Sequence, residues 1–232
     1  MKPELMILIP ARDEENNIAA VIQGVKNNVQ SEIIVIDDAS SDRTACIARS
    51  EGARVLPLAL HLGAWGAIRT GIRYACHRQY DIAITIDADG QHQPESIRDI
   101  IEPIVSDQAD VVIGSCIERG SAARKISWLF FRKFTGLNVQ DLTSGFRAYN
   151  AAAISALISS DTALLDYQDI GVLLALTKAG LRIVEVPVRM CPRASGHSRV
   201  FSSWWDVFRY LMLTGILCLS KVNRRAIPDA DL

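Results

Sequence analysis

Short apolar runs alternate with longer segments of helical periodicity, and this alternation limits the fold more than any other feature of the sequence. The runs are rich in Ile and Val and lie at residues 5–9, 32–36, 82–86 and 109–113. Between them, the spacing of apolar residues predicts helices at 15–28, 42–51 and 64–78. Strands that alternate with helices form parallel sheets with helices on both faces. The sequence therefore predicts an α/β fold with a mostly parallel sheet.

Length and composition fit one such domain. The chain has 232 residues, of which 49% are hydrophobic, so it can bury one large core or two small ones. We expect one sheet domain over residues 1–200 and an amphipathic helix with a tail at 201–232. The net charge is −1, and no basic stripe is present that could neutralise a nucleic-acid backbone. We therefore expect no nucleic acid among the partners, and the sequence does not predict an oligomeric state.

The cysteines and the N-terminus indicate the compartment. There are five cysteines without a C-x-x-C pair or a regular spacing, and an odd number argues against a closed disulfide framework. The first apolar run ends at Pro10, which makes it too short for a signal peptide or a membrane span. These features predict reduced thiols and a cytoplasmic protein.

Acidic residues follow three of the predicted strands at the point where each strand ends. The segments are PARDEEN, DDASSD and DADGQH. In open sheets of this kind, ligands bind outside the carboxyl ends of the strands. One acidic strand end is usually a helix cap or a solvated turn. Three carboxylate clusters at one sheet edge would repel one another unless a cation lies between them, so the pattern favours a divalent metal.

The segment DIAITIDADGQHQP, residues 81–94, carries the most informative of these clusters. Asp87 and Asp89 can both approach one cation, and Gly90 allows the backbone to come close. Oxygen ligands indicate Mg²⁺ or Mn²⁺, which keep several waters and bind phosphate oxygens. A nucleotide diphosphate is therefore the natural third partner of this D-x-D motif.

Seven short motifs occur in order along the chain. They are IPARDEENNI (9–18), VIDDASSDRT (35–44), LGAWGAIRTG (62–71), IDADGQHQPE (86–95), VVIGS (111–115), DLTSGFRAYN (141–150) and RASGHSR (193–199). In this order they resemble family 2 glycosyltransferases with a GT-A fold, in the dolichol-phosphate mannosyltransferase-like, polyprenyl-phosphate glycosyltransferase branch. The resemblance implies a metal-dependent, inverting transfer of a sugar from a GDP-mannose or UDP-hexose type of donor to a lipid-linked acceptor.

The resemblance also implies roles at the donor. Asp38 would bind the base or the ribose, and the nucleotide end of the donor would be lined by Pro10, Arg12 and Glu14. Asp87 would face the sugar nucleotide in a catalytic role, whereas Asp89 and Gln91 would hold the metal on the diphosphate. Asp37 and Asp42 match the family pattern too, but a strand end and a helix cap explain them equally well.

Further residues are implied on the acceptor side. In TSGFRAYN, Ser144 and Arg147 flank a turn at Gly145 that borders the acceptor, although an ordinary turn into an Ala-rich helix at 150–158 explains the segment as well. Asp169 is similar in position to the acidic residue that acts as catalytic base in the family. An acceptor hydroxyl would need that base, whereas an acceptor phosphate is already ionised. In RASGHSR, a solvated linker is the alternative to a lid that closes over phosphates with Arg193 and Arg199.

The chain departs from many relatives at two places. Cys116 follows the GS of VVIGS where many relatives have an arginine, so Arg119 or Arg124 would have to bind phosphate instead. At 204–220 the uncharged stretch after Arg209 is too short to cross a bilayer. Paired Trp residues before it and basic residues after it suit an interfacial helix or a docking surface for a membrane protein partner, and packing on the body of the protein is an equal alternative. We therefore expect a peripheral protein at the cytoplasmic face of a membrane.

Other functions make different demands on the sequence. A nicotinamide dehydrogenase would need G-x-G-x-x-G directly after the first strand, where this chain has PARDEE. A glycosyltransferase that adds sugar to a glycan hydroxyl, and a non-catalytic nucleotide-sugar-binding protein, are compatible with the same motifs and stay open.

Overall fold

The computed structural model describes residues 3–116, 139–141, 144–158 and 170–191. Some of the predictions above fall outside the described residues and remain predictions. They concern Asp169, Arg193, Arg199, Arg119, Arg124 and the helix and tail at 201–232.

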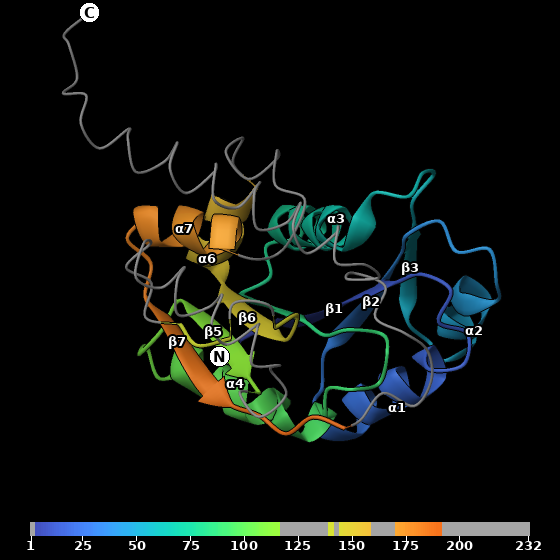
Figure 1. The fold of residues 1–232 in the computed structure, drawn as a ribbon, viewed down its shortest axis with the longest axis horizontal. Coiled ribbons are helices and arrows are strands. Elements are labelled where there is room, and N and C mark those ends of the chain that lie inside the picture. Colours follow the sequence, from blue (N-terminus) through green and yellow to red (C-terminus); the bar gives the residue numbers. More distant parts are fainter. Residues whose placement is uncertain (1–2, 117–138, 142–143, 159–169, 192–232) are drawn as a thin grey trace, which may run out of the picture.

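A seven-stranded sheet forms the centre of the described part of the chain (Figure 1). In spatial order its strands are β3 (Arg54–Pro57), β2 (Glu32–Asp37), β1 (Leu5–Ala11), β4 (Ile82–Thr85), β6 (Arg147–Asn150), β5 (Val111–Ser115) and β7 (Ile183–Pro187). Neighbouring strands are parallel except at β6, which is antiparallel to both β4 and β5. The prediction of a mostly parallel α/β sheet is therefore confirmed.

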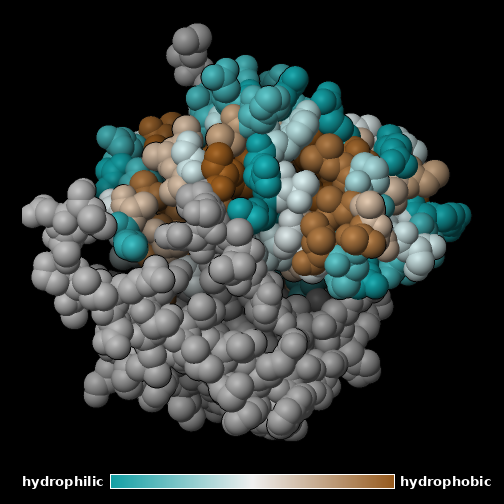
Figure 2. Space-filling view, turned by 90° about the horizontal axis from the view of Figure 1, so that it is seen from above, coloured by the Kyte–Doolittle hydropathy of each residue, from teal (hydrophilic) through white to brown (hydrophobic). Residues whose placement is uncertain are grey.

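Helices cover both faces of the sheet, as the alternating pattern predicts (Figure 1). One face carries α1 (Ile18–Asn28), α2 (Thr44–Ser50), the 3₁₀ turn η1 (Pro94–Ser96) and α4 (Ile97–Val105), and the other carries α3 (Gly63–His77), α6 (Ala151–Leu157) and α7 (Ile170–Lys178). Seen from the side of α3, α6 and α7, the described surface shows hydrophobic patches between hydrophilic residues (Figure 2). In the part of the chain that the structure describes, no helix combines the length and the hydropathy that crossing a membrane requires.

Two hydrophobic clusters, one on each face, join the helices to the sheet. Along β1, Ile7 and Ile9 belong to the cluster under α1, whereas Met6 and Leu8 belong to the cluster under α3, and all four are 0% exposed. Successive side chains of a strand point to opposite faces, so a strand covered on both faces is apolar throughout. Burying each such side chain stabilises the fold by about 1.5–3 kcal/mol. The run LMILI is therefore a central strand.

The helices predicted at 15–28, 42–51 and 64–78 are confirmed, with ends that differ by at most three residues. Helix α1 begins at Ile18 instead of at residue 15, because the backbone N–H groups of Asn17 and Ile18 donate to the Glu14 carbonyl in a preceding turn, at 3.0 and 2.9 Å. The strand predicted at 109–113 is observed at Val111–Ser115. Just before it, the backbone N–H of Ala109 donates to the Pro103 carbonyl at 2.9 Å, and the Asp110 side chain bonds to Arg182 and Asn150.

This Asp110 contact joins β5 to β7 at the edge of the sheet where the parallel strands begin. Arg182 donates to the Asp110 carboxylate from its backbone N–H at 2.7 Å and from Nε at 3.0 Å, and Asn150 donates from Nδ2 at 2.9 Å. The hydrogen bonds from Arg182 lower the pKa of Asp110 from 3.8 to about 2. The ion pair thus ties β5, β6 and β7 together at their shared end.

Strand order also decides where ligands can bind. β2, β1 and β4 are adjacent and parallel, with Ala11 opposite Asp37 and Leu8 opposite Thr85. The loops that follow these strands therefore leave the same edge of the sheet, which we call the carboxyl edge, and the opposite edge is the amino edge. All three acidic segments singled out in the sequence lie at the carboxyl edge.

Candidate functional site

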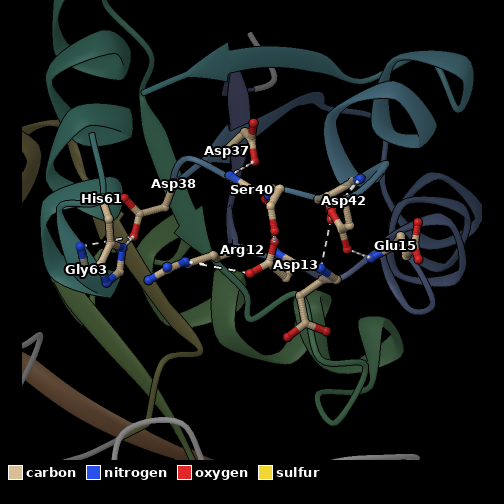
Figure 3. Close-up of polar contacts among 12 residues, drawn as sticks. Arg12, Asp13, Glu15, Asp37, Asp38, Ser40, Asp42, His61 and Gly63 are labelled. Atoms are coloured by element: carbon tan, nitrogen blue, oxygen red, sulfur yellow. Dashed lines mark hydrogen bonds and ion pairs between the residues drawn. The ribbon is translucent and has the colours of Figure 1, made fainter. Parts of the chain in front are cut away.

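The loops after β1 and β2 are bonded to each other at the carboxyl edge (Figure 3). The backbone N–H of Asp13 donates to Ser40 Oγ at 3.0 Å, and the Asp13 carboxylate accepts from Ser41 N at 2.8 Å. Asp13 and Ala39 both adopt positive φ angles, 50° and 57°. A left-handed backbone is uncommon for residues other than glycine and is found where the surroundings impose it, often at functional sites. The two loops therefore form one preformed wall.

A second set of contacts at this wall explains Asp42. Its carboxylate accepts from the backbone N–H of Thr44 at 2.9 Å and of Glu15 at 3.1 Å. Burial by itself would raise the pKa of Asp42, but the hydrogen bonds from Thr44 and Glu15 outweigh it, so the pKa is lowered. Asp42 thus stands just before α2 and ties the start of that helix to the loop after β1, which is the structural interpretation of this residue.

Asp38 lies deepest in the wall, and only 4% of its surface is exposed. Its carboxylate accepts from the backbone N–H groups of Leu62 at 2.7 Å and Gly63 at 3.0 Å, and it lies 2.7 Å from Nδ1 of His61 (Figure 3). These contacts hold the first turn of α3 against the end of β2. The His61 side chain is 51% exposed, so its ring borders the space in front of Asp38.

The other residues predicted at the nucleotide end lie at the end of β1, beside Asp38. Pro10 is opposite Ile36 in the β1–β2 ladder. The Arg12 side chain is 45% exposed, with Nε 3.8 Å from the Asp13 carboxylate. Glu14 accepts from Asn17 Nδ2 at 2.8 Å. The structure therefore brings the predicted donor residues to one place, although their binding role stays a prediction.

The D-x-D motif forms a turn directly after β4. Gly90 has φ +72°, and Asp89 Oδ1 accepts from the backbone N–H of Gln91 at 3.1 Å. The Asp87 side chain is 42% exposed, whereas Gln91 is buried. The turn thus presents Asp87 at the surface of the carboxyl edge while its end is anchored in the body of the protein.

Segment 144–147, predicted on the acceptor side, lies against the D-x-D turn. An added Cβ at Gly145 would be 2.5 Å from Asp87 Oδ1, closer than real Cβ contacts, so only glycine fits there without a shift. Thr85 Oγ1 donates to the Gly145 carbonyl at 2.7 Å. The predicted turn at Gly145 is therefore the place where β6 approaches the carboxylate of Asp87.

The two flanking residues of this segment make contacts inside the protein. The Ser144 hydroxyl donates to the Gly114 carbonyl at 2.6 Å and accepts from Phe146 N at 3.2 Å. Arg147 is 0% exposed, and its Nε donates to the Ser144 carbonyl at 2.8 Å. In this structure both side chains shape the turn, and the substrate-binding role predicted for them is untested.

The residues just before the predicted lid are among those that the structure describes. Cys191 donates from its backbone N–H to the Gln91 carbonyl at 2.8 Å, and His92 forms an isolated antiparallel bridge with Met190. Cys191, two positions before RASGHSR, therefore contacts the D-x-D turn, whereas RASGHSR itself lies outside the described residues. Cys116, where many relatives have arginine, donates from its backbone N–H to Asp141 at 3.3 Å.

The residues of the D-x-D turn fit part of a metal shell. Within the described ranges, no three His, Cys, Asp or Glu side chains gather closely enough to hold an ion by themselves. Two carboxylates in a glycine-containing turn suit a hard cation such as Mg²⁺ or Mn²⁺, which normally takes its remaining oxygens from water and substrate phosphates. The arrangement therefore suits an ion that arrives with a diphosphate.

Three residues make contacts at the site that were not predicted from the sequence. Gly145 and His92 contact Asp87, and His61 contacts Asp38. His92 stands inside a motif that carried the resemblance, and His61 directly precedes the motif at 62–71. The position of each histidine in or beside a matched motif could have marked it as a site residue. Only the fold shows which carboxylate each histidine contacts.

Comparisons with known proteins agree with this geometry. The model of the family described as "Glycosyl transferase family 2" matches residues 6–159. An undecaprenyl-phosphate mannosyltransferase of Micrococcus luteus is 32% identical, over 84% of this chain and 87% of its own. A UDP-N-acetylglucosamine–dolichyl-phosphate N-acetylglucosaminyltransferase of Methanococcus voltae is 30% identical, over 80% and 84%.

Among solved structures, glucosyl-3-phosphoglycerate synthase of Mycobacterium tuberculosis, crystallised with Mn²⁺, UDP-glucose and phosphoglyceric acid, is similar in fold. Its TM-score is 0.71 at 20% identity, over 99% of this chain and 82% of that chain. The expected GT-A fold is thereby confirmed.

Proposed function

Because the chain belongs to glycosyl transferase family 2, we propose that it transfers a hexose from a nucleotide-sugar donor to a polyprenyl phosphate. Relatives that are 32% and 30% identical over 84% and 80% of this chain are named for undecaprenyl-phosphate and dolichyl-phosphate acceptors. The observation that carries the proposal is the meeting of three acidic loops at the carboxyl edge, with Asp87 presented at its surface.

The nucleotide end of the donor would lie along the wall built by the loops after β1 and β2. Arg12 and Glu14 would line the nucleotide end. Asp38, the most buried of these residues, would bind the base or the ribose. Asp38 already accepts hydrogen bonds from two backbone N–H groups, so its carboxylate is held in place before the nucleotide sugar binds. Such preorganisation lowers the entropy lost on binding.

The diphosphate and the sugar would lie over the D-x-D turn. Asp89 and Gln91 would hold Mg²⁺ or Mn²⁺, and the ion, when bound, would neutralise charge on the departing diphosphate. The Mycobacterium tuberculosis neighbour was crystallised with Mn²⁺ and UDP-glucose, which supports a divalent ion without choosing between the two metals. Asp87 would face the donor sugar.

The transfer itself needs little proton movement when the acceptor is a phosphate. An acceptor phosphate oxygen supplies the electron pair for the new bond to the sugar C1, and the bond from C1 to the diphosphate breaks as the nucleoside diphosphate leaves. A hydroxyl acceptor would instead lose a proton to a general base, for which we propose Asp169. We propose that Arg193 and Arg199 contact phosphate groups, since they follow Cys191, whose backbone N–H donates to the Gln91 carbonyl.

A lipid acceptor requires the enzyme to reach a membrane. We propose peripheral association at the cytoplasmic face through residues 201–232, either directly or through a membrane protein partner. The stretch carries Trp204 and Trp205 at one end and Lys221, Arg224 and Arg225 at the other, a composition that suits a lipid interface. Flotation with anionic liposomes tests this, since truncation after residue 203 should abolish it.

The experiment that tests the function has two stages. Thermal-shift measurements with GDP-mannose, UDP-glucose and UDP-N-acetylglucosamine, each with Mg²⁺ or Mn²⁺, should show which donor raises the melting temperature. The selected donor, radiolabelled in its sugar, is then incubated with undecaprenyl phosphate. Label in the lipid fraction supports the proposal, whereas label transferred only to glycan hydroxyls would favour the polysaccharide alternative.

A further inference from the structure

His92 belongs to the motif around the D-x-D turn, yet the proposed function gives it no role. Its side chain is only 2% exposed, although Asp87, five positions earlier, is 42% exposed. Burying a polar ring is unfavourable unless the ring is hydrogen bonded. The partner of His92 therefore indicates why a histidine occupies this position.

That partner is Asp87, because His92 Nε2 lies 3.2 Å from Asp87 Oδ2. A carboxylate only accepts hydrogen bonds, so Nε2 carries the proton and donates it. The buried Nδ1 has no hydrogen-bond partner among the described residues. The hydrogen bond to Asp87 therefore requires the proton to be on Nε2, and Nδ1 takes no part in it.

The ring of His92 is itself held by packing. It lies against the Phe146 ring, with 5.1 Å between ring centroids and 42° between planes. Phe146 is fully buried and follows Gly145, whose Cα approaches the Asp87 carboxylate so closely that a Cβ would meet Oδ1 at 2.5 Å. Asp87 is thus confined by a hydrogen bond from His92 and by the backbone at Gly145.

We propose that His92 is a positioning residue for sugar transfer: its Nε2–H, held by Phe146, keeps the Asp87 carboxylate turned toward the donor. The proposal rests on the proposed function, in which Asp87 faces the donor sugar. A carboxylate on a surface turn can rotate about two side-chain bonds, and a group that must act in one orientation loses efficiency when it rotates. Removing the hydrogen bond that orients Asp87 should therefore lower affinity or activity about 10–100-fold, which is the effect of removing hydrogen bonds that orient metal-binding side chains.

Three substitutions separate the hydrogen bond from the packing. His92→Gln places an amide N–H near the position of Nε2, and His92→Asn places one nearer to Nδ1, out of reach of Asp87. His92→Phe keeps a ring against Phe146 but has no donor. We expect His92→Phe and His92→Asn to lower kcat about 10–100-fold, and His92→Gln to recover most of that loss. His92→Phe should keep the wild-type melting temperature.

Two readouts do not depend on turnover. Nitrogen NMR of the histidine rings should show a proton on Nε2 of His92 in the wild type. Calorimetry with the selected donor and Mn²⁺ should show a dissociation constant raised about tenfold in His92→Phe and little changed in His92→Gln.

The outcomes distinguish the two proposals. If His92→Phe keeps wild-type kcat and donor affinity, the positioning role is wrong and the ring serves packing only. If His92→Gln is impaired as much as His92→Phe, an N–H near the position of Nε2 does not restore function, and the positioning role is wrong as well. If the wild type transfers no sugar but the donor affinities follow the expected order, the proposed transfer is wrong while the positioning of Asp87 stands.

Discussion

Two carboxylates at the carboxyl edge of the sheet and two at the amino edge are held by different partners. At the carboxyl edge, Asp38 and Asp42 accept hydrogen bonds from backbone N–H groups of neighbouring loops. At the amino edge, Asp110 is bonded by the guanidinium of Arg182, and Glu32 by Arg54 with Nε at 3.1 Å. Backbone amides fix a carboxylate without cancelling its charge, whereas an arginine neutralises it.

This difference separates a binding edge from a structural edge. The amide-held carboxylates keep a negative potential over the loops, where a cation with its phosphate ligand is attracted. At the amino edge, the carboxylates bound by arginine are neutralised. They join strands that are distant in sequence, such as β5 and β7. Substitutions at the carboxyl edge should therefore change activity more than stability, and those at the amino edge the reverse.

Asp89→Asn should give the largest effect on activity. It removes a charge that the proposed function places on the metal, so metal-dependent donor binding and turnover should fall about 100-fold or more. Loss of a negative charge at an acidic edge should leave the free energy of unfolding unchanged or slightly higher. Donor titration by calorimetry with and without Mn²⁺ measures the first effect, and denaturant unfolding measures the second.

Asp99→Asn is the matched control, because Asp99 is an exposed carboxylate on α4. It should change donor affinity little. If donor binding by Asp89→Asn still depends on the metal as much as in the wild type, the ion binds elsewhere. The carboxyl edge would then not be the binding edge.

Gly145→Ala should combine a loss of activity with a loss of stability. The new Cβ would meet Asp87 Oδ1 at 2.5 Å and must displace either the carboxylate or the turn. Overpacking of this kind costs about 1–3 kcal/mol, and a displaced Asp87 should lower kcat about tenfold or more, as misplacement of catalytic groups does.

Gly71→Ala provides the comparison in the core, since its Cβ would meet Ile36 and Leu8 at 2.9 Å under α3. It should cost similar stability and leave kcat largely unchanged. Equal loss of kcat in both variants would show that general destabilisation explains Gly145→Ala.

The elements that the sequence predicts well are those whose own residues define them. LMILI, EIIVI and IAITI are apolar throughout because both faces of β1, β2 and β4 are covered. β3 and β6 have four residues each and include Arg54, Arg147 and Asn150, so packing by neighbours rather than periodicity makes them strands. β7 follows α7 through a turn at Gly180 with φ +78°. A helical stretch that ends with Gly180 can be predicted from the sequence, but the strand after it was not predicted.

The same division applies to the site. Acidic strand ends were visible in the sequence, and their convergence followed from a parallel sheet. The contact between Asp87 and Gly145 was not visible, because it depends on β6 entering antiparallel beside β4. Likewise, the sequence gives no sign that His61 would meet Asp38, which lies 23 positions earlier.

Asp110→Asn should lower the free energy of unfolding through the amino edge and leave activity unchanged. The pKa of Asp110 is about 2 in the folded protein, below its ordinary value of 3.8, so its ion pair stabilises the fold above pH 4 and loses this contribution as the pH falls toward 2. Because the Arg182 side chain is 48% exposed, we expect a loss of only about 1–2 kcal/mol at pH 7. The difference from wild type should shrink as unfolding is measured at pH 4, 3 and 2.

Asp107→Asn is the control for that series. Asp107 also contacts Arg182, at 2.7 Å, but its side chain is 91% exposed, so its removal should change stability little. A pH-independent loss in Asp110→Asn would mean that shape rather than charge joins β5 to β7.

His61→Ala should have the smallest effect, and it tests whether backbone amides alone can hold a carboxylate at the binding edge. The His61 ring lies 2.7 Å from Asp38 but is 51% exposed, whereas Leu62 N and Gly63 N reach the same carboxylate from the start of α3. If the amides dominate, stability should change by less than about 0.5 kcal/mol and KM for the donor by a fewfold.

Arg182→Ala supplies the contrast, because its side chain makes four hydrogen bonds at the amino edge and its loss leaves Asp110 unneutralised. We expect Arg182→Ala to destabilise clearly more than His61→Ala when both are unfolded in urea at pH 7. Equal destabilisation by the two variants would show that the imidazole, and not the amides, holds Asp38, and the two edges would then stabilise their carboxylates in the same way.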